Sequence, residues 1–538
     1  MLRLVLLLSL VALPVRADSL SDRAFQAAQL AMLSSAGSAI RQAELRRAAG
    51  SGPLADLLKA RQRVADRRAR AEAELGALGR SGTSQTSDAT RLSGEIEAFG
   101  TEIARLDAQI ATSFPRFAEL TRPRPMALSE VQQALAPDEG LLFIYTGATE
   151  THIWAVTPTR TAWQRIGLGE ADIAGDVAAL RQSLSVASNA RGAEALKRLG
   201  QKPQITPFDR TRAHLVYADL LADMMPALAE AERLYTVARG PLTGLPLGLL
   251  VMEMPTDPAQ DGDPEALRAT PWFFQRFALA ALPTVESLRA IAAPAPALAA
   301  NTPTRRFLGI GAPRLTGGAN GLRGVTMSGA TADPESIRAL APLPGTLREL
   351  RAIAATLDAG PASLLTGDAA VEPALREAGL EKAEVVVFAT HGLLSGELEG
   401  LAEPALVLTP PEVASATNDG LLTASEIADM SLSAEWVILS ACNTAGGDGR
   451  PDAEGLSGLA RAFLVAGAET LMVSHWPVRD DAAARLTTDA FSALTRDDIQ
   501  SKSSALQASM QAMLEDGSDP TLAHPAAWAP FILVGDGS

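Results

Sequence analysis

Short apolar runs rich in β-branched residues alternate with helical stretches from Met126 to the end of the chain, and this alternation constrains the fold most. It is typical of an α/β fold built on a mostly parallel sheet. The stretch 293–304 is Ala/Pro-rich and nearly uncharged, which is typical of a linker. Because we expect nine strands to be too many for one compact sheet, we predict two α/β units, over residues 126–300 and 301–538. The predicted strands are residues 141–145, 152–157, 234–238, 277–282, 307–311, 385–389, 436–439, 470–474 and 531–534.

Residues 18–125 differ from the rest of the chain, because they are rich in Ala, Arg, Glu and Leu and contain no strand-like run. Apolar residues recur there at spacings of four and three, which is typical of a coiled-coil seam: Leu92, Ile96, Phe99, Ile103, Leu106 and Ile110. A matching stripe lies between residues 54 and 78, and the polar residues 81–87 separate the two stripes. We predict a helical, coiled-coil-like hairpin, preceded by a helix over about residues 22–48. Such a region is a spacer or packing element, or it holds a partner protein.

The composition excludes one class of partner. The chain has 538 residues, 47% of them apolar and 20% charged, which is ordinary for a globular protein of several folding units. Its net charge of -15 and its aromatic content of 4% argue against nucleic acid as a partner, because nucleic-acid binders need basic faces and stacking platforms. The acidic excess lies in the α/β region, since residues 18–125 carry 16 basic and 13 acidic residues.

The first seventeen residues have the layout of a secretory signal peptide. Arg3 precedes an apolar run over residues 4–13, and the small residues Val15 and Ala17 precede the expected cleavage position. We therefore predict an exported protein, periplasmic or extracellular; the alternative is a buried N-terminal strand or helix. The run is about half of the ~20 residues that a spanning helix needs, and no later segment reaches that length, so we predict no membrane span.

Cys442 is the only cysteine. An intramolecular disulfide and a multi-cysteine zinc site are therefore excluded, and we predict no metal and no cofactor. An isolated cysteine with apolar neighbours is commonly a buried core residue, so Cys442 either packs in the core or serves as a reactive thiol.

Two buried-strand runs place polar residues just beyond their ends. His391 and Gly392 follow the run 385–389, and Cys442 follows the run 436–439. In an open α/β sheet, ligands bind at the carboxyl ends of the strands. If these two strands are parallel neighbours, a right-handed crossover places the thiol and the imidazole at one edge of the sheet.

This pairing has a chemical reason, because the thiolate is the nucleophile and a free thiol, with a pKa of ~8.5, is only slightly ionised near pH 7. A nearby imidazolium or a helix N-terminus after Cys442 would lower its pKa; alternatively, His391 acts mainly as a general acid for a leaving amine. Gly392 has no Cβ, so a backbone N–H can approach a developing oxyanion there, with the N–H of Cys442 as a second donor.

Six motifs follow one another along the chain: Pro344-Gly345-Thr346 with Glu349, residues 388–392, residues 440–444, residues 454–463, Trp476-Pro477-Val478, and residues 528–536. In this order they resemble the CHAT-domain family of caspase-like proteins. Residues 128–142 and 242–250 are similar to the amino-terminal half of that family, so the resemblance runs from about Met126 to the end.

The resemblance implies a pseudo-peptidase unit followed by an active cysteine-peptidase unit of the caspase, separase and gingipain type. It implies that His391 is the catalytic histidine and Cys442 the nucleophile, acting on a protein or peptide substrate. The chain departs from the family in lacking recognisable tetratricopeptide repeats. It also lacks the caspase residues beside the nucleophile, so aspartate specificity is not implied.

The remaining polar residues are weaker candidates. Asp448, Asp452 and Glu454 follow the predicted nucleophile and would form a pocket for Lys or Arg, although such residues commonly form a solvated loop. His475 ends another predicted strand; it either lines the cleft or is a structural histidine with its hydrogen bonds satisfied, and we favour the second interpretation. The leading hypothesis is an exported cysteine endopeptidase. The rival hypotheses are a catalytically silent scaffold that binds a partner and a redox role for the free thiol.

Overall fold

A computed structural model describes residues 18–32, part of 57–75, 86–113, 124–184, 206–292, 305–317, 327–328, 331–394, 401, 403–415, 417–441 and 458–538. Its strands are β1 Glu139–Thr146, β2 Thr151–Val156, β3 Thr161–Ile166, β4 Arg233–Ala238, β5 Ala278–Ala281, β6 Arg305–Pro313, β7 Met327–Ser328, β8 Thr331–Ala332, β9 Leu364–Gly367, β10 Ala383–Ala389, β11 Gly392–Leu393, β12 Ala405–Val407, β13 Leu421–Thr423, β14 Trp436–Ser440, β15 Thr470–Ser474 and β16 Phe531–Gly535.

Helices flank these strands in the α/β part and form most of the described N-terminal region. They are α1 Asp18–Ala31, α4 Thr86–Ser113, α6 Leu128–Ala134, α7 Glu170–Ser183, α9 Arg210–Leu220, α10 Pro264–Arg268, α11 Phe273–Arg276, α12 Ser287–Ala292, α13 Pro334–Arg338, α14 Pro344–Thr356, α15 Glu372–Ala378, α16 Ala424–Asp429, α17 Gly458–Ala466, α18 Asp480–Ala493, α19 Lys502–Glu515 and α20 Pro525–Trp528. The predicted α/β class is therefore confirmed.

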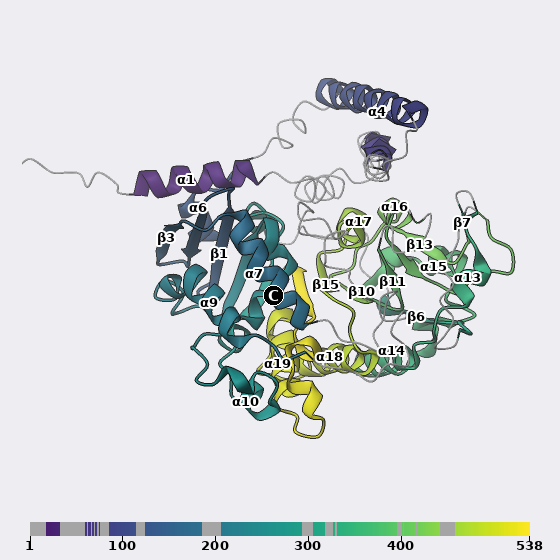
Figure 1. Ribbon diagram of the computed structural model, residues 1–538. Helices are drawn as coiled ribbons and strands as arrows, with labels where there is room; N and C mark the ends of the chain where they lie inside the picture. The colour runs from purple at the N-terminus through teal and green to yellow at the C-terminus, as the bar shows by residue number, and fades with distance from the viewer. Residues whose placement is uncertain are drawn as a thin grey trace, which may run out of the picture.

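One sheet of eleven strands runs through the α/β part of the chain, in the order β3-β2-β1-β4-β5-β16-β15-β14-β10-β6-β9. The expectation that nine strands are too many for one sheet is wrong. The physical reason is the last strand, β16, which returns to the middle of the sheet and pairs with β15 on one side and with β5 on the other. Figure 1 shows this strand in yellow between the teal and green halves.

The strands on either side of the β16–β15 pair run in opposite directions, except for β2, which is antiparallel to its neighbours β1 and β3. β16 is parallel to β5 and antiparallel to β15, whereas β15, β14, β10, β6 and β9 are parallel neighbours. The catalytic half predicted from the sequence is thus an open parallel sheet whose strand ends meet at one edge. The linker predicted over residues 293–304 lies outside the described residues.

Helices cover both faces of the parallel half. On one face α14 and α18 bury apolar side chains such as Ile353 and Leu486, and on the other face α16 and α17 bury Ile427 and Phe463. β10 can be covered on both sides because the run Val385 to Ala389 is entirely apolar, as expected of a central parallel strand. Figure 1 shows these helix layers below and above the green strands.

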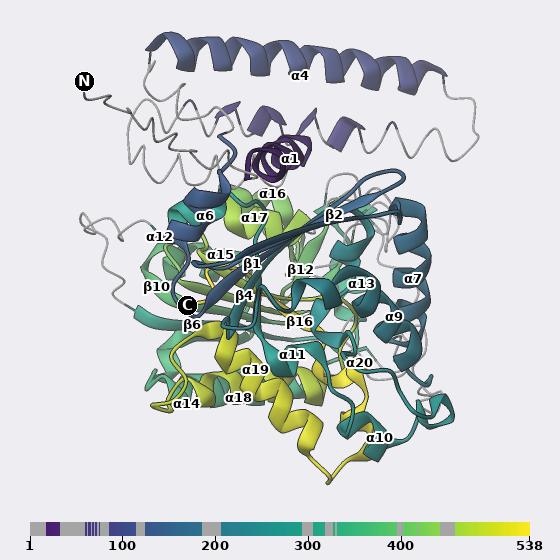
Figure 2. The ribbon, with the colours of Figure 1, turned by 90° about the vertical axis from the view of Figure 1, so that its left-hand side faces the viewer.

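The described part of the N-terminal region is helical. α1 packs on the sheet through Phe25, which is fully buried with its ring 5.3 Å from that of Phe143. α4 lies alongside helical positions between residues 57 and 75 (Figures 1 and 2). The pairs Arg61 with Asp107 and Arg67 with Phe99 show that these two segments run antiparallel, as in the predicted hairpin.

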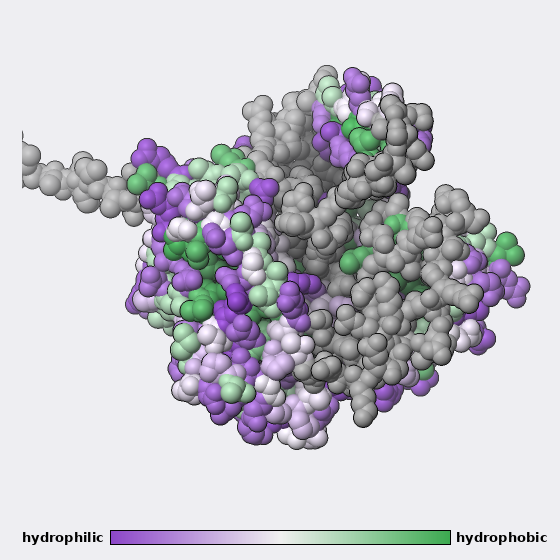
Figure 3. Space-filling model, in the orientation of Figure 1, coloured by the Kyte–Doolittle hydropathy of each residue, from purple (hydrophilic) through white to green (hydrophobic). Residues whose placement is uncertain are grey.

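Parts of the N-terminal prediction fall outside the described residues. They are the signal segment 1–17 and residues 33–48 of the predicted first helix. In α4 the predicted seam residues Leu92 and Leu106 are buried, and Ile96, Phe99 and Ile103 are half-buried. No helix among the described residues is both long and apolar enough to cross a bilayer. Figure 3 shows a mostly hydrophilic described surface on one face, with apolar residues in small groups.

α16 contains a carboxyl group that makes stability depend on pH. Burial and the neighbouring Glu372 raise the pKa of Glu426 to about 7, while Thr423 and Arg376 partly oppose the shift. The folded state therefore holds a proton that the unfolded state, with a pKa of 4.5, releases earlier. Stability is fully present below the unfolded pKa and is lost as pH rises through the folded pKa.

We expect the free energy of unfolding to fall by about 2 kcal/mol between about pH 5 and pH 8 because of Glu426. Glu426→Gln keeps the side-chain oxygen that completes the α16 capping box with Thr423, and it should remove most of this fall in urea titrations. Glu377→Gln, at an exposed position of α15, is the matched control and should leave it intact. An unchanged pH dependence in Glu426→Gln would show that another group causes it.

Candidate functional site

β10 and β14 are parallel neighbours, as the sequence analysis required. Their register pairs Val385 with Trp436 and Ala389 with Ser440. His391 lies two residues beyond Ala389, and in the sequence Cys442 lies two residues beyond Ser440. Cys442 itself is outside the described residues, which stop at Ala441 before resuming at residue 458.

A backbone carbonyl fixes the imidazole of His391. The ring is fully buried, and its Nε2 lies 2.8 Å from the carbonyl oxygen of Ala341. A carbonyl only accepts, so Nε2 carries a proton in this contact. In the neutral ring this leaves Nδ1 as the basic nitrogen, the atom that can take a proton from another group.

Hydrogen bonds with Val407 of β12 hold the backbone around His391 in place. The hydroxyl of Thr390 donates to the carbonyl oxygen of Val407 at 2.6 Å, and the N–H of Val407 donates to the carbonyl oxygen of His391 at 3.0 Å. Gly392 then begins β11, where it is buried and pairs with Leu406. These hydrogen bonds fix the position of the His391 backbone relative to the end of β10. The predicted oxyanion role of Gly392 stays a prediction.

The strand end that precedes Cys442 is also held in place. The hydroxyl of Ser474, the last residue of β15, donates to the carbonyl oxygen of Ala441 at 2.7 Å, and both residues are buried. Sequence analysis missed Ala341 and Val407 because they act through backbone atoms, and it missed Ser474 because its hydroxyl donates to a backbone carbonyl that is distant in sequence. The only available signal was that Ser474 ends an apolar strand with a polar residue.

Two of the resemblance motifs meet beside Ala341. The N–H of Gly345, in the first turn of α14, donates to Asp480 Oδ2 at 2.5 Å, and Asp480 opens α18 just after Trp476-Pro477-Val478. A Cβ on residue 345 would lie 2.2 Å from that oxygen, so the contact requires glycine. Deeper in the same helix pair, Thr487 donates to the buried carboxylate of Glu349 at 2.8 Å. The motifs thus fix the segment that holds the histidine.

The other candidates have different outcomes. Asp448, Asp452 and Glu454 lie outside the described residues. His475 follows β15, is 2% exposed and has a pKa that burial lowers to about 3, so its ring is neutral. Its Nδ1 has no hydrogen-bond partner among the described residues, which differs from the satisfied histidine that we expected.

Histidines elsewhere hold local structure. His524 Nδ1 accepts from the N–H of Ala526 at 3.2 Å at the start of α20, and burial lowers its pKa to about 4. His152 contacts Glu150, and His214 contacts the carbonyl oxygen of Val251, at 3.0 Å each. Within the part of the chain that the structure describes, no group of three or more His, Cys, Asp or Glu side chains is placed to hold a metal ion.

Comparison with curated proteins finds relatives that share a segment. The chain is 37% identical over 115 residues to mouse tetratricopeptide repeat protein 28, covering 21% of this chain and 4% of the relative. It is 30% identical over 228 residues to the human protein of that name, covering 36% of this chain and 8% of the relative. The chain therefore spans less than a tenth of these relatives.

Among solved structures, the Saccharomyces cerevisiae separase-securin complex matches with a TM-score of 0.42 and 10% identity, over 84% of this chain and 34% of that chain. The Arg-specific cysteine proteinase gingipain R matches with a TM-score of 0.34 and 10% identity, over 61% of this chain and 67% of that chain. The CHAT domain matches residues 211–536, more than half of the chain and all of the edge that carries His391. The predicted resemblance is therefore confirmed, and the chain belongs to the CHAT domain family.

Proposed function

We propose that this protein is an exported cysteine endopeptidase that cleaves a polypeptide with Cys442 as nucleophile and His391 as its proton partner. The observation that carries the proposal is the register of β10 and β14, which pairs the residues two positions before His391 and Cys442. Membership in the CHAT domain family supports it, because the family resemblance assigns these two roles to these two positions. Export rests on the signal-like segment 1–17.

The proposed reaction passes through a thioester. The sulfur of Cys442 attacks the scissile carbonyl carbon, and its proton passes to Nδ1 of His391, since Nε2 is committed to Ala341. The imidazolium then protonates the leaving amine as the C–N bond breaks, leaving an acyl-enzyme. Water, deprotonated by the same nitrogen, attacks the thioester and releases the acid and the thiol. Backbone N–H groups of Gly392 and Cys442 stabilise the oxyanion in this scheme.

The proposed substrate preference follows from charge. Asp448, Asp452 and Glu454 lie within twelve residues of the nucleophile in the sequence, and such carboxylates favour a Lys or Arg side chain before the scissile bond. Substituting all three by their amides should then reduce cleavage after basic residues without creating cleavage after acidic ones.

The proposal is tested by incubating the purified protein with a peptide library, with and without prior iodoacetamide treatment. Because the chain has one cysteine, alkylation by iodoacetamide reports on Cys442 alone. We expect cleavage that alkylation abolishes, with product mass spectra identifying the residue before the cut. Cleavage that survives complete alkylation, confirmed by intact mass, would exclude the mechanism.

Ser474 offers a positioning test of the same site. Ser474→Ala removes the hydrogen bond to Ala441, and we expect a loss of about 1 kcal/mol in unfolding free energy together with a several-fold lower kcat at nearly unchanged KM. Ser509→Ala is the matched control, because Ser509 is equally buried and donates to the carbonyl oxygen of Leu486 at 2.8 Å, away from the site. If both variants lower kcat equally, Ser474 contributes only stability.

A second candidate function is a binding scaffold that keeps the fold without turnover. One contact favours it: Arg70, in the helical N-terminal region, lies 3.0 Å from Glu403 and donates to Ser425 at 2.9 Å. A partner held by the helical region would therefore lie against the catalytic half. Under this alternative, Cys442→Ala and His391→Ala leave partner capture intact, and no peptide is cleaved under any condition.

A further inference from the structure

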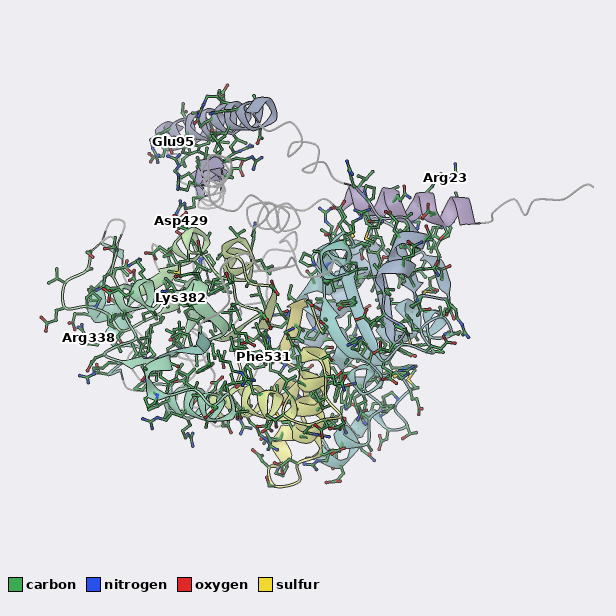
Figure 4. The ribbon with its side chains drawn as sticks, turned by 180° about the vertical axis from the view of Figure 1, so that it is seen from behind. Arg23, Glu95, Arg338, Lys382, Asp429 and Phe531 are labelled. Atoms are coloured by element: carbon green, nitrogen blue, oxygen red, sulfur yellow. The ribbon has the colours of Figure 1, made fainter. Side chains whose placement is uncertain are left out.

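The two halves of the sheet are joined at a seam, between β5 and β16, by less strand pairing than β16 makes with β15. β5 and β16 pair through Val534 and Ala281, whereas β16 and β15 pair over five residues from Thr470 to Ser474. A cavity of about 490 Å³ lies at this seam and is lined by both strands, among them Leu279 and Phe531. Figure 4 labels Phe531 in the middle of the molecule, where the two halves meet.

The cavity has the size and walls of a small-molecule site. Ligand pockets commonly measure about 300–1,000 Å³ and are mainly apolar, whereas packing defects in a well-packed core are far smaller. The walls come from the segment after β4, from α11 and its flank, and from α19: Leu245, Leu247, Phe274, Phe277, Leu506 and Met510. The lining of the cavity contains neither His391 nor Ala441; the cavity approaches the proposed peptidase site only at His475, which follows Ser474.

One end of the cavity is electropositive and incompletely hydrogen-bonded. His475 lines it, and Nδ1 of this buried ring has no partner among the described residues. Behind His475, the guanidinium of Arg181 donates to the carbonyl oxygens of Gly244 at 2.5 Å and of His475 at 3.2 Å. The contacts of Arg181 in the described part of the chain are to backbone carbonyl oxygens and not to a carboxylate, and burial lowers its pKa. A buried cation without a counter-charge is unfavourable, and an anion nearby relieves it.

The other end of the cavity carries both signs of charge. Arg239 and Glu170 both line it, so this end does not select an anion. These two ends of the cavity lie at opposite ends of the strands. His475 follows Ser474, which pairs with Phe531 at the start of β16. Arg239 follows the last residue of β4, which runs in the same direction as β16. At about 3.3 Å per residue, Phe531 and Val534 are roughly 10 Å apart, which gives the cavity an elongated form.

We propose that the seam cavity binds a single-chain amphiphile with an anionic head. The head lies at the end formed by His475 and Arg181, and the alkyl chain runs along β16 toward Arg239. A carboxylate and a phosphate monoester share this chemistry, since both accept hydrogen bonds from a neutral imidazole and favour a nearby guanidinium. The bound amphiphile would contact both halves of the sheet, whose strands β5 and β16 pair only through Ala281 and Val534.

The test is calorimetric titration of the full chain, below the micellar concentration, with dodecanoate, dodecyl phosphate and dodecyltrimethylammonium. We expect one molar equivalent of at least one anionic probe to bind, at least tenfold more tightly than the cationic probe. If only one of the two anionic probes binds, its head group shows whether the site takes a carboxylate or a phosphate monoester. Equal affinity for the cationic and anionic probes, or binding of none, would overturn the proposal.

Variants separate the cavity from unspecific association. Thr243→Trp places an indole in the cavity wall and should abolish binding, whereas Thr159→Trp, the same change at an exposed turn, should not. If Thr243→Trp does not fold, Leu506→Trp, which changes a cavity residue of α19, takes its place and should likewise abolish binding. Arg181→Met should weaken anion binding at least tenfold and Arg181→Lys should restore most of it. Unchanged binding in a folded tryptophan variant would place the amphiphile elsewhere.

Discussion

Replacing Cys442 with alanine is expected to lower kcat/KM for a cleaved peptide by about 10⁴-fold or more, because no thioester can form. Replacing His391 with glutamine should lower it by about 10²–10⁴-fold, since the leaving amine then has no proton donor. Residues that act as one unit are strongly non-additive. The double variant should therefore be no slower than Cys442→Ala, as measured by product formation under subsaturating substrate.

His214→Gln is the matched control for the histidine change. His214 is half-buried and, like His391, contacts one backbone carbonyl oxygen, that of Val251 at 3.0 Å, but it lies in α9, in the part of the chain before β4. His214→Gln should change kcat/KM by no more than about twofold from that of the unaltered protein. If His391→Gln were as active as His214→Gln, or if the effects of the two active-site changes simply multiplied, the proposed partnership of thiol and imidazole would be wrong.

Removing the ring of Phe388 is expected to cost about 3–5 kcal/mol of unfolding free energy. Phe388 is fully buried in β10, between Ile310 of β6 and Leu439 of β14, and its ring lies 5.2 Å from that of Phe463 in α17. Phe388→Ala leaves a cavity three residues before His391, so urea unfolding should show the loss and the activity should fall with it.

Phe388→Leu is the graded comparison, because it keeps most of the apolar volume. It should cost less than half as much as Phe388→Ala. A loss below about 1 kcal/mol for Phe388→Ala would mean that the β10 core collapses around the gap. The contact between strand and helix would then not be what holds this strand end.

All nine strands predicted from the sequence are present, because each is a continuous apolar run that is buried in the sheet. In the large sheet, the strands that were missed are the two at its ends, β3 and β9; the other missed strands are short and form two separate small sheets, β11-β12-β13 and β7-β8. β3 contains the adjacent polar residues Gln164 and Arg165 and is half-buried or exposed throughout, and β9 has only four residues, all half-buried. Edge strands bury less, so their sequences carry a weaker hydrophobic signal.

The arrangement of the strands was harder to predict than their existence. The pairing of β16 with both halves depends on the last residues of the chain returning to the centre, and no local pattern encodes such a contact. The close approach of two strands was not predictable either: a Cβ at residue 311 would lie 2.0 Å from the carbonyl oxygen of Ala389, so Gly311 lets β6 approach β10.

The site was predictable only in its outline. That a histidine follows one strand and a cysteine the next can be inferred from apolar runs and the topology of parallel sheets. The groups that orient His391, namely the carbonyl of Ala341 and the amide of Val407, are backbone atoms at positions whose side chains carry no polar signal. Sequence patterns report side-chain chemistry, so backbone partners became visible only in the fold.

Treatment with 1,3-dibromoacetone, followed by intact-mass measurement and peptide mapping, tests the central claim most directly. The thiolate of the single cysteine displaces one bromide, and an imidazole within reach of the three-carbon bridge displaces the other. The account predicts a crosslink between Cys442 and His391 that His391→Gln abolishes, leaving one-ended alkylation. A crosslink to His475 instead, or alkylation of Cys442 without any crosslink in the unaltered protein, would contradict it.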